Sequence, residues 1–321
     1  MHMRYSAGFL LALVLNLTGC SAGGDAPAAD GRTPVALQLN WVPEPEFGGY
    51  YAALQIGADR EAGLSLDVRG GGPGTPVEQM VAAGRIDFGV SSADNVLIAR
   101  SRGADLVAIY AVYQTFPQGI MTHSGRGLKS LAQVFESGTI AMEPGTPYER
   151  LLRQRFGLDK VRAVPYTNNL APFLHDPLFA QQCFITAEPI AARRAGADPQ
   201  VFPLTDVGYN PYAGVIITRS KVIAENPELV RSLVATVRRG WQAYLQDPRA
   251  ANAEMHRLNP TMDLETFAAV AAAQEPLIAP ADPSESELGT MRLERWEALA
   301  AQLTELGIID RAEPSNAFHN P

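Results

Sequence analysis

The side chains that could recognise a small molecule are aromatic or acidic, and they follow segments predicted to be β-strands. Five aromatic residues stand at such places, namely Trp41, Phe47, Tyr50, Tyr113 and Tyr148. Flat side chains of this kind can enclose a planar ring between their faces. Two acids, Glu143 and Glu188, stand at comparable places and could accept hydrogen bonds from a ring amine or N–H. This set is typical of a site for a planar heterocycle.

Smaller polar residues complete the candidate site, because hydroxyl, amide and backbone N–H groups at strand ends can point into a cleft. They are Gly72, Thr75, Ser91, Ser92, Asn95 and Gln114. The glycine cluster at 70–74 lacks the Gly-Lys-Ser/Thr ending of a phosphate loop, so we interpret it as a turn that offers amide donors. Tyr50 and the glycines before it could instead only shape a helix start.

Composition argues against several other chemistries. A net charge of −8 without any basic run disfavours nucleic acid as a partner. The five histidines lack metal-ligand spacing and no catalytic triad or carboxylate pair can be defended, so we expect no metal, no cofactor and no enzyme activity. No Lys or Arg occurs in 40–51, 91–95 or 143–148, which disfavours an anionic ligand, although backbone amides alone can bind one. Cys183 lies in an apolar run and is interpreted as a buried structural thiol.

Two series of alternating strands and helices must position these residues. Apolar periodicity predicts four first strands, at 35–41, 63–68, 86–90 and 106–113, with helices between them at 47–62, 77–83 and 93–101. A second series of strands follows at 119–122, 139–142, 161–166, 183–186 and 201–204. Segment 213–218 is interpreted as a return to the first series, before helices that start at 226, 263 and 285. The pattern predicts an α/β fold with mixed, mostly parallel sheets and helices on both faces.

Domain boundaries follow from this order. We expect the first part of lobe 1 to span 34–116 and lobe 2 to span 117–210. The chain should then return to lobe 1 and form C-terminal helices over 211–311, before a frayed tail at 312–321. Ligands of open α/β sheets bind outside the carboxyl ends of the strands, so the candidate residues should face one cleft between the lobes.

The N-terminal segment is predicted to be an export signal, residues 1–20, followed by a flexible tether at 21–33. Its apolar stretch is shorter than the ~20 residues that a bilayer span needs. It ends in Leu-Thr-Gly-Cys, which resembles the bacterial lipobox and implies that Cys20 is lipidated. We therefore expect attachment to a bacterial membrane only through this lipid anchor.

Several motifs resemble the family that joins sulfonate-binding and thiamine-pyrimidine proteins. They include Asn-Trp-Val-Pro-Glu-Pro-Glu-Phe-Gly-Gly-Tyr-Tyr-Ala-Ala at 40–53, Glu-Ala-Gly-Leu-Ser-Leu-Asp-Val at 61–68, Gly-Arg-Ile-Asp-Phe-Gly-Val at 84–90, Phe-Ile-Thr-Ala-Glu-Pro at 184–189 and the segment 219–230. The resemblance spans about residues 35–250. It implies a two-lobe periplasmic-binding-protein fold of type II, with the ligand cleft between the lobes.

The resemblance also implies a function. Most members are periplasmic or surface-anchored receptors, so we expect a monomer that binds a small molecule and hands it to the permease and ATPase subunits of an ABC importer. The aromatic candidates favour a thiamine-precursor pyrimidine or a riboflavin-like compound, with an alkanesulfonate, taurine or nitrate as the alternative.

One branch of this family is the fungal enzyme that makes the thiamine pyrimidine. The enzymes of this branch carry a motif similar to Asn-Trp-x-Pro-x-Pro-Tyr-His. The resemblance implies that its His and a downstream Lys supply atoms of the pyrimidine, and that a cysteine-rich run binds iron. Phe47 stands here at the His and Ile56 at the Lys, and the cysteine-rich run is absent. A synthase-like enzyme is therefore the less favoured alternative.

Overall fold

The computed structural model describes residues 2, 31–279 and 288–321 of the chain. The predicted signal peptide, the lipidation site Cys20 and most of the predicted tether lie outside these residues, as does the start of the helix predicted at 285–305. No helix within the described part of the chain is long and apolar enough to cross a bilayer.

The first lobe is built on a five-stranded sheet in the order β2-β1-β3-β10-β4. Its strands are β1 (Thr33–Gln38), β2 (Leu64–Arg69), β3 (Phe88–Ser92), β4 (Val107–Tyr113) and β10 (Ala213–Thr218). β1 pairs in parallel with β2 and β3, whereas β10 runs antiparallel to both β3 and β4. All seven residues of β4 are buried, because helices and the C-terminal segment enclose this strand. The expected return of the chain to this sheet is present as β10.

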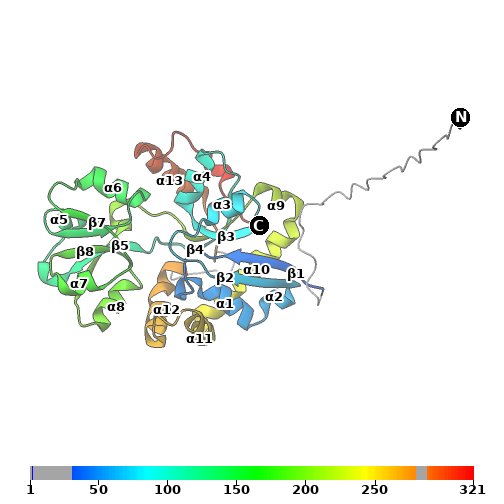
Figure 1. Cartoon of the computed structure of the whole chain (residues 1–321), viewed down its shortest axis with the longest axis horizontal. Helices are drawn as coiled ribbons and strands as arrows, with labels where there is room; N and C mark the ends of the chain where they lie inside the picture. The colour runs from blue at the N-terminus through cyan, green and yellow to red at the C-terminus, as the bar shows by residue number, and fades with distance from the viewer. Residues whose placement is uncertain (1, 3–30, 280–287) are drawn as a thin grey trace.

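Helices cover both faces of this sheet (Figure 1). They are α1 (Gly48–Gln55), α2 (Ala58–Glu61), α3 (Val77–Ala82), α4 (Ala93–Ser101), α9 (Ser220–Glu225), α10 (Pro227–Gln246), α11 (Arg249–Leu258), α12 (Leu264–Ile278) and α13 (Leu293–Glu305). The single helix predicted at 47–62 is wrong: it divides at Gly57, whose φ of 72° is left-handed and ends α1.

Close packing of α1 against α10 fixes the start of α1. A Cβ on Gly49 would lie 2.3 Å from the indole of Trp241, and one on Gly240 would lie 2.1 Å from the carbonyl oxygen of Gly49. Only glycine permits this approach of the two backbones. The loop before α1, which contains the short helix η1 (Pro45–Phe47), is therefore held firmly against the first lobe.

The second lobe has its own five-stranded sheet in the order β7-β6-β8-β5-β9. Its strands are β5 (Gln118–His123), β6 (Thr139–Met142), β7 (Arg162–Pro165), β8 (Phe179–Phe184) and β9 (Pro199–Pro203). Helices flank it, namely α5 (Leu131–Val134), α6 (Pro147–Phe156), α7 (Ala171–His175) and α8 (Glu188–Arg194). β6 pairs in parallel with β7 and β8, and β5 runs antiparallel to β8 and β9, so both sheets are mixed as expected.

The lobes are joined by two crossovers, from β4 to β5 and from η3 (Leu204–Val207) to β10 (Figure 1). Arg295 of α13 ties the crossovers together. Its guanidinium donates to the carbonyl oxygen of Gln114 in the first crossover and to those of Asn210 and Pro211 in the second, at 2.7 and 2.9 Å for the latter two. It also lies 3.9 Å from the ring centroid of Tyr212. We call this group the hinge clamp.

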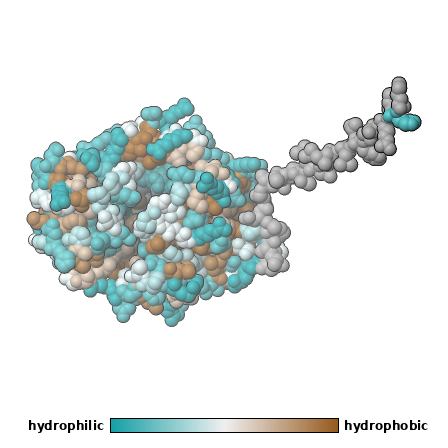
Figure 2. Space-filling view, in the orientation of Figure 1, coloured by the Kyte–Doolittle hydropathy of each residue, from teal (hydrophilic) through white to brown (hydrophobic). Residues whose placement is uncertain are grey.

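The expectation of a frayed tail from Ala312 is wrong. Ala317 and His319 exchange backbone hydrogen bonds with Ala108 of β4, and Phe318 stacks on Trp296 with ring centroids 5.7 Å apart. The tail therefore pairs with β4 and covers α13, which periodicity could not indicate because the segment is too short and too rich in Pro and Asn. The face of the molecule shown in Figure 2 is mainly hydrophilic, and its apolar residues are scattered in small groups.

Candidate functional site

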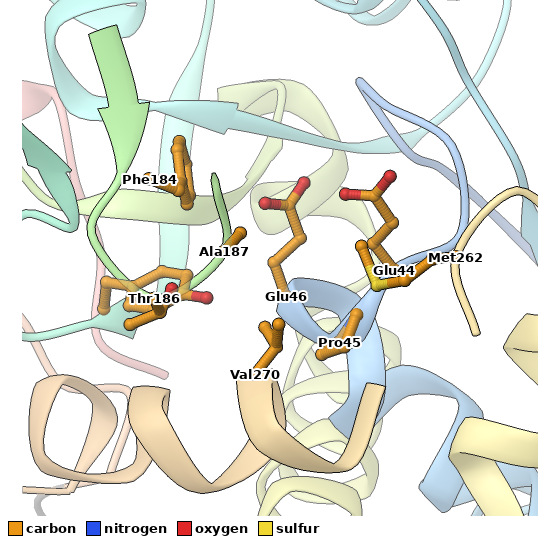
Figure 3. Close-up of a pocket in the computed structure, with 9 residues that line it drawn as sticks. Glu44, Pro45, Glu46, Phe184, Thr186, Ala187, Met262 and Val270 are labelled. Carbon is orange, nitrogen blue, oxygen red and sulfur yellow. The ribbon is translucent and has the colours of Figure 1, made fainter. Parts of the chain in front are cut away.

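A pocket lies where the two lobes meet. Its space, about 220 Å³ with the adjoining open solvent included, is lined by nine residues, namely Glu44, Pro45, Glu46, Tyr113, Phe184, Thr186, Ala187, Met262 and Val270. The first four come from the first sheet and the loop after β1, the next three from the end of β8 in the second lobe, and the last two from α12 and the loop before it (Figure 3). The pocket thus unites segments that are far apart in the sequence.

The loop after β1 is held in place from the opposite side by amide side chains. Gln274 of α12 donates from its Nε2 to the carbonyl oxygen of Pro45 at 2.8 Å. Asn259 donates to the carbonyl oxygen of Pro43 at 3.2 Å and to the Glu44 carboxylate at 3.5 Å. Because these bonds satisfy the backbone, the side chains of Glu44 and Glu46 remain directed into the pocket (Figure 3).

Three carboxyl groups influence one another here. Burial raises the pKa of Glu44 from 4.5 to about 7, with a further contribution from the charge of Glu188, while the bond from Asn259 opposes the shift. Burial also raises the pKa of Glu46 well above its usual range, and the charges of Glu44 and Glu188 add to the effect. Like charges at close range disfavour simultaneous ionisation, so these acids retain protons near neutral pH.

Glu188 differs from the other two acids because both of its oxygens are engaged. The hydroxyl of Tyr166 donates to Oε1 at 2.8 Å, and the N–H of Phe184 donates to Oε2 at 2.7 Å. Burial raises its pKa, and these two bonds counteract the shift. Glu188 therefore fixes the end of β8, which places Phe184 at the wall of the pocket. Its charge also raises the pKa values of Glu44 and Glu46.

Two aromatic rings form the walls between the lobes. Tyr113, at the end of β4, donates its hydroxyl to Oε1 of Gln274 at 2.7 Å, so its ring is fixed. Phe184 meets it edge to face, with ring centroids 6.3 Å apart and an interplanar angle of 82°. Both rings line the pocket, although Tyr113 is only 2% exposed and also belongs to the core.

The other predicted aromatic contacts lie elsewhere. Phe47, Tyr50 and Tyr148 are 2%, 0% and 3% exposed and belong to the core, where Tyr50 packs edge to face on Trp241. Trp41 is partly buried against the core and does not line the pocket. Phe47 and Tyr50 turn inward because the α1–α10 contact draws the first turn of α1 onto the sheet. Of the five aromatic residues predicted to enclose a ring, Tyr113 alone lines this pocket, together with Phe184, which was not predicted.

The predicted polar residues form local bonds instead of lining the pocket. Gly72 and Thr75 bond to each other in a turn, Ser91 donates to Glu78, Ser92 donates to Asp94, and the N–H of Asn95 donates to Asp94. Gln114 donates to Ala111 and Thr290 at the hinge. Glu143 is exposed, and its N–H donates to the Tyr148 hydroxyl. Each of these groups stabilises the loop in which it lies.

Sequence reasoning missed Glu44 and Glu46. A usable signal existed, because both acids stand in the Pro-rich loop directly after the first strand, where a ligand contact is expected. Val270 of α12 and Met262 of the loop before it carried no such signal, since only the fold brings them to the cleft. No group of three or more His, Cys, Asp or Glu side chains in the described segments 31–279 and 288–321 is arranged to hold a metal ion.

Comparison with known proteins places the chain in a family. Residues 44–251 match the family described as NMT1/THI5 like, and the chain belongs to it. A riboflavin-binding protein, RibY, from Chloroflexus aurantiacus is 25% identical over 261 residues, which cover 74% of each chain. A 4-amino-5-hydroxymethyl-2-methylpyrimidine phosphate synthase from Candida albicans is 25% identical over 252 residues, covering 72% of this chain and 74% of that protein.

Solved structures agree with the two-lobe architecture. The periplasmic aliphatic sulphonate-binding protein SsuA from Escherichia coli has a TM-score of 0.67 at 15% identity and covers 90% of this chain and 92% of its own. A Candida albicans protein with the generic periplasmic binding protein fold has a TM-score of 0.57 at 12% identity, with coverages of 89% and 96%. The fold is therefore that of periplasmic binding proteins.

Proposed function

We propose that this member of the NMT1/THI5-like family is an extracytoplasmic solute-binding protein that delivers a small molecule to the permease and ATPase subunits of an ABC importer. The observation that carries the proposal is the pocket between the lobes, to which both lobes contribute side chains. In a two-lobe protein, such a site couples ligand binding to closure, because the bound ligand contacts both halves. The riboflavin-binding relative and the sulphonate-binding neighbour are consistent with this role.

The ligand that fits best is a small planar nitrogen heterocycle, such as a thiamine-precursor pyrimidine. Its ring would lie against Phe184 and Tyr113, and ring or exocyclic N–H groups would donate to the acids of the loop after β1.

An anionic ligand is disfavoured by the lining of the pocket. Sulfonate, taurine and nitrate sites need positive groups or several free amide donors, and the pocket has three acids at or beside it and no Lys, Arg or His in its wall. Catalysis is also disfavoured. Phe47, at the position of the family's reactive His, is buried in the core, and Ile56, at the Lys position, is 44% exposed at the end of α1.

A thermal-shift screen tests the proposal. Hydroxymethyl and formamido pyrimidines, thiamine, riboflavin, taurine and nitrate are compared, because a ligand that binds only the native state raises its melting temperature. We expect a shift with a single-ring pyrimidine that is lost in Phe184→Ala and kept in Phe156→Ala, a partly buried Phe in the second lobe away from the pocket. A shift only with taurine or nitrate would contradict the heterocycle and keep the transport role.

We further propose that the mature protein is a monomer held at the outer face of a bacterial membrane by lipid on Cys20. The lipobox-like tetrapeptide supports the anchor. Replacement Cys20→Ala should move the protein from the membrane fraction to the soluble fraction, because a lipid chain would be its one attachment. Retention of the variant in the membrane fraction would contradict the anchor.

A further inference from the structure

Glu44 and Glu46 face the pocket without a compensating positive charge. Glu46 has no hydrogen-bond partner among the described residues, and Glu44 has only the long bond from Asn259 at 3.5 Å. Glu188, by contrast, has a donor on each oxygen. The two acids of the loop after β1 thus have unused acceptor capacity directed at the space where a ligand would lie (Figure 3).

Among the described residues, no Lys, Arg or His lines the pocket beside these acids. The titratable groups that act on them electrostatically are Glu188 of α8, Tyr166 after β7, Tyr113 of β4 and Tyr50 of α1. The α12 side contributes the uncharged Met262 and Val270. A carboxylate removed from water is strongly destabilised unless a cation or a proton accompanies it. The pocket therefore favours a positively charged guest over a neutral or negative one.

Two further features of the lining point to the same kind of guest. The aromatic faces of Phe184 and Tyr113 carry negative quadrupole charge and attract cations that lie against them. Thr186 is 3% exposed, lines the pocket, and its hydroxyl has no hydrogen-bond partner among the described residues. This hydroxyl keeps some accessible surface on the pocket, so a ligand that offers an N–H or an acceptor can bond to it.

We infer that the pocket binds a planar organic cation, with its positive nitrogen beside the carboxylates of Glu44 and Glu46 and its ring against Phe184 and Tyr113. The inference rests on the proposed solute-binding function and names the charge of the ligand. Glu188 and Tyr166 hold the second lobe in place around the ring. Thr186 bonds to a polar substituent at the ring edge.

Binding of the cation exchanges it for a proton. The pKa of Glu44 is about 7 because of burial and the charge of Glu188, so near neutral pH the group is partly protonated. A cation stabilises the carboxylate and lowers its pKa, which releases the proton on binding. Affinity for a cation of fixed charge should therefore rise with pH through about 7 and then level off.

A matched set of probes tests the charge. 4-Amino-1-methylpyridinium and 4-methylaniline have the same shape and differ only in the charge of one ring atom, and 4-aminobenzoate is the anion of similar size. Calorimetry above neutral pH should give at least about tenfold tighter binding for the pyridinium than for the aniline, which is ~1.4 kcal/mol, and no binding of the benzoate. Titration in two buffers of different ionisation enthalpy should reveal proton release near pH 7.

Variants assign the effect to the two acids. Glu46→Gln should reduce pyridinium affinity about tenfold and leave aniline affinity within about twofold, and Glu44→Gln should flatten the pH dependence. Glu136→Gln is the control, because it removes the same charge from an exposed acid that pairs with Lys160 in the second lobe. It should change neither the affinity for the pyridinium nor its pH dependence. Equal affinities of pyridinium and aniline would overturn the inference alone, whereas binding of no probe or heterocycle to the wild-type protein would overturn the solute-binding function with it.

Discussion

The hinge and the pocket both contain partly buried ionisable side chains, but these side chains have very different numbers of hydrogen-bond partners. Arg295 in the hinge clamp donates to the carbonyl oxygens of Gln114, Asn210 and Pro211 and to the side chain of Asn210. Glu46 in the pocket has no hydrogen bond among the described residues. Both side chains lie between the lobes, so their location does not explain the difference in hydrogen bonding. We attribute it to the different roles of the two groups.

The difference separates stability from recognition. A guanidinium with its donors satisfied stabilises the junction of the two crossovers and restricts how the lobes move. A buried acid without a hydrogen-bond partner lowers the stability of the folded protein, but its oxygens remain free to accept hydrogen bonds from a ligand. If this view is correct, neutralising the hinge cation should weaken the fold, whereas neutralising a pocket acid should strengthen it.

The largest effect is expected for Arg295→Met. The change removes a forked donor from backbone oxygens of both crossovers, so the free energy of unfolding should fall by ~2–4 kcal/mol in urea denaturation. Arg295→Lys should recover less than half of this loss, because an ammonium cannot reproduce the fork. Arg257→Met, which removes an exposed pair with Glu254, serves as the control and should hardly change stability. A loss for Arg295→Met no larger than the control's would refute the clamp.

A smaller effect of opposite sign is expected for Glu44→Gln. Folding raises the pKa of Glu44 from 4.5 to about 7, so the folded protein keeps a proton that the unfolded chain releases in this interval. Stability from this group is present below about pH 4.5 and is lost as the pH rises to about 7. Between these limits the variant should gain ~2–3 kcal/mol relative to the wild type, measured without ligand.

Glu254→Gln provides a control with the reverse pH dependence. Its hydrogen bond from Arg257, aided by the charge of that residue, lowers the pKa of Glu254, so this carboxylate contributes stability that is lost as the pH falls. The variant should therefore lose stability relative to the wild type as the pH rises. If Glu44→Gln also lost stability relative to the wild type as the pH rises, this would contradict the view that ionised Glu44 destabilises the folded protein.

Much of the fold could be predicted because local pattern and tertiary structure agree in these segments. The helix predicted at 93–101 has those bounds in the structure, since Ala93–Ser101 combines apolar periodicity with a preceding strand. The return to the first sheet at Ala213–Thr218 was visible as an apolar β-branched run. The packed tail was not predictable, because its contacts with Ala108 and Trp296 depend on positions over two hundred and about twenty residues away.

The site was predicted less well than the fold, for a physical reason. The rule that ligands lie beyond the carboxyl ends of strands indicated the loops after β1 and β8, which line the pocket, and also the loops after β2, β3 and β6, which do not. It could not say which side chains of a loop turn inward, and Tyr50 turned toward Trp241 while Glu46 turned toward the cleft. That choice is made by the packing of α1 on α10, where glycines 49 and 240 allow close contact.

The smallest effect is expected at the rim of the cleft, where Arg194 of α8 bridges the second lobe to Asp263 and Glu265 of α12 at 3.2 and 2.9 Å. All three side chains are exposed, so solvent and salt screen the pair. Arg194→Ala should speed amide hydrogen exchange in segment 184–188 by about two- to threefold at low salt and hardly at all at high salt. Arg193→Ala is the matched control on the same helix and should leave exchange unchanged. An effect of Arg194→Ala that persists at high salt would mean that this bridge, like the hinge clamp, holds the fold and does not merely bias closure.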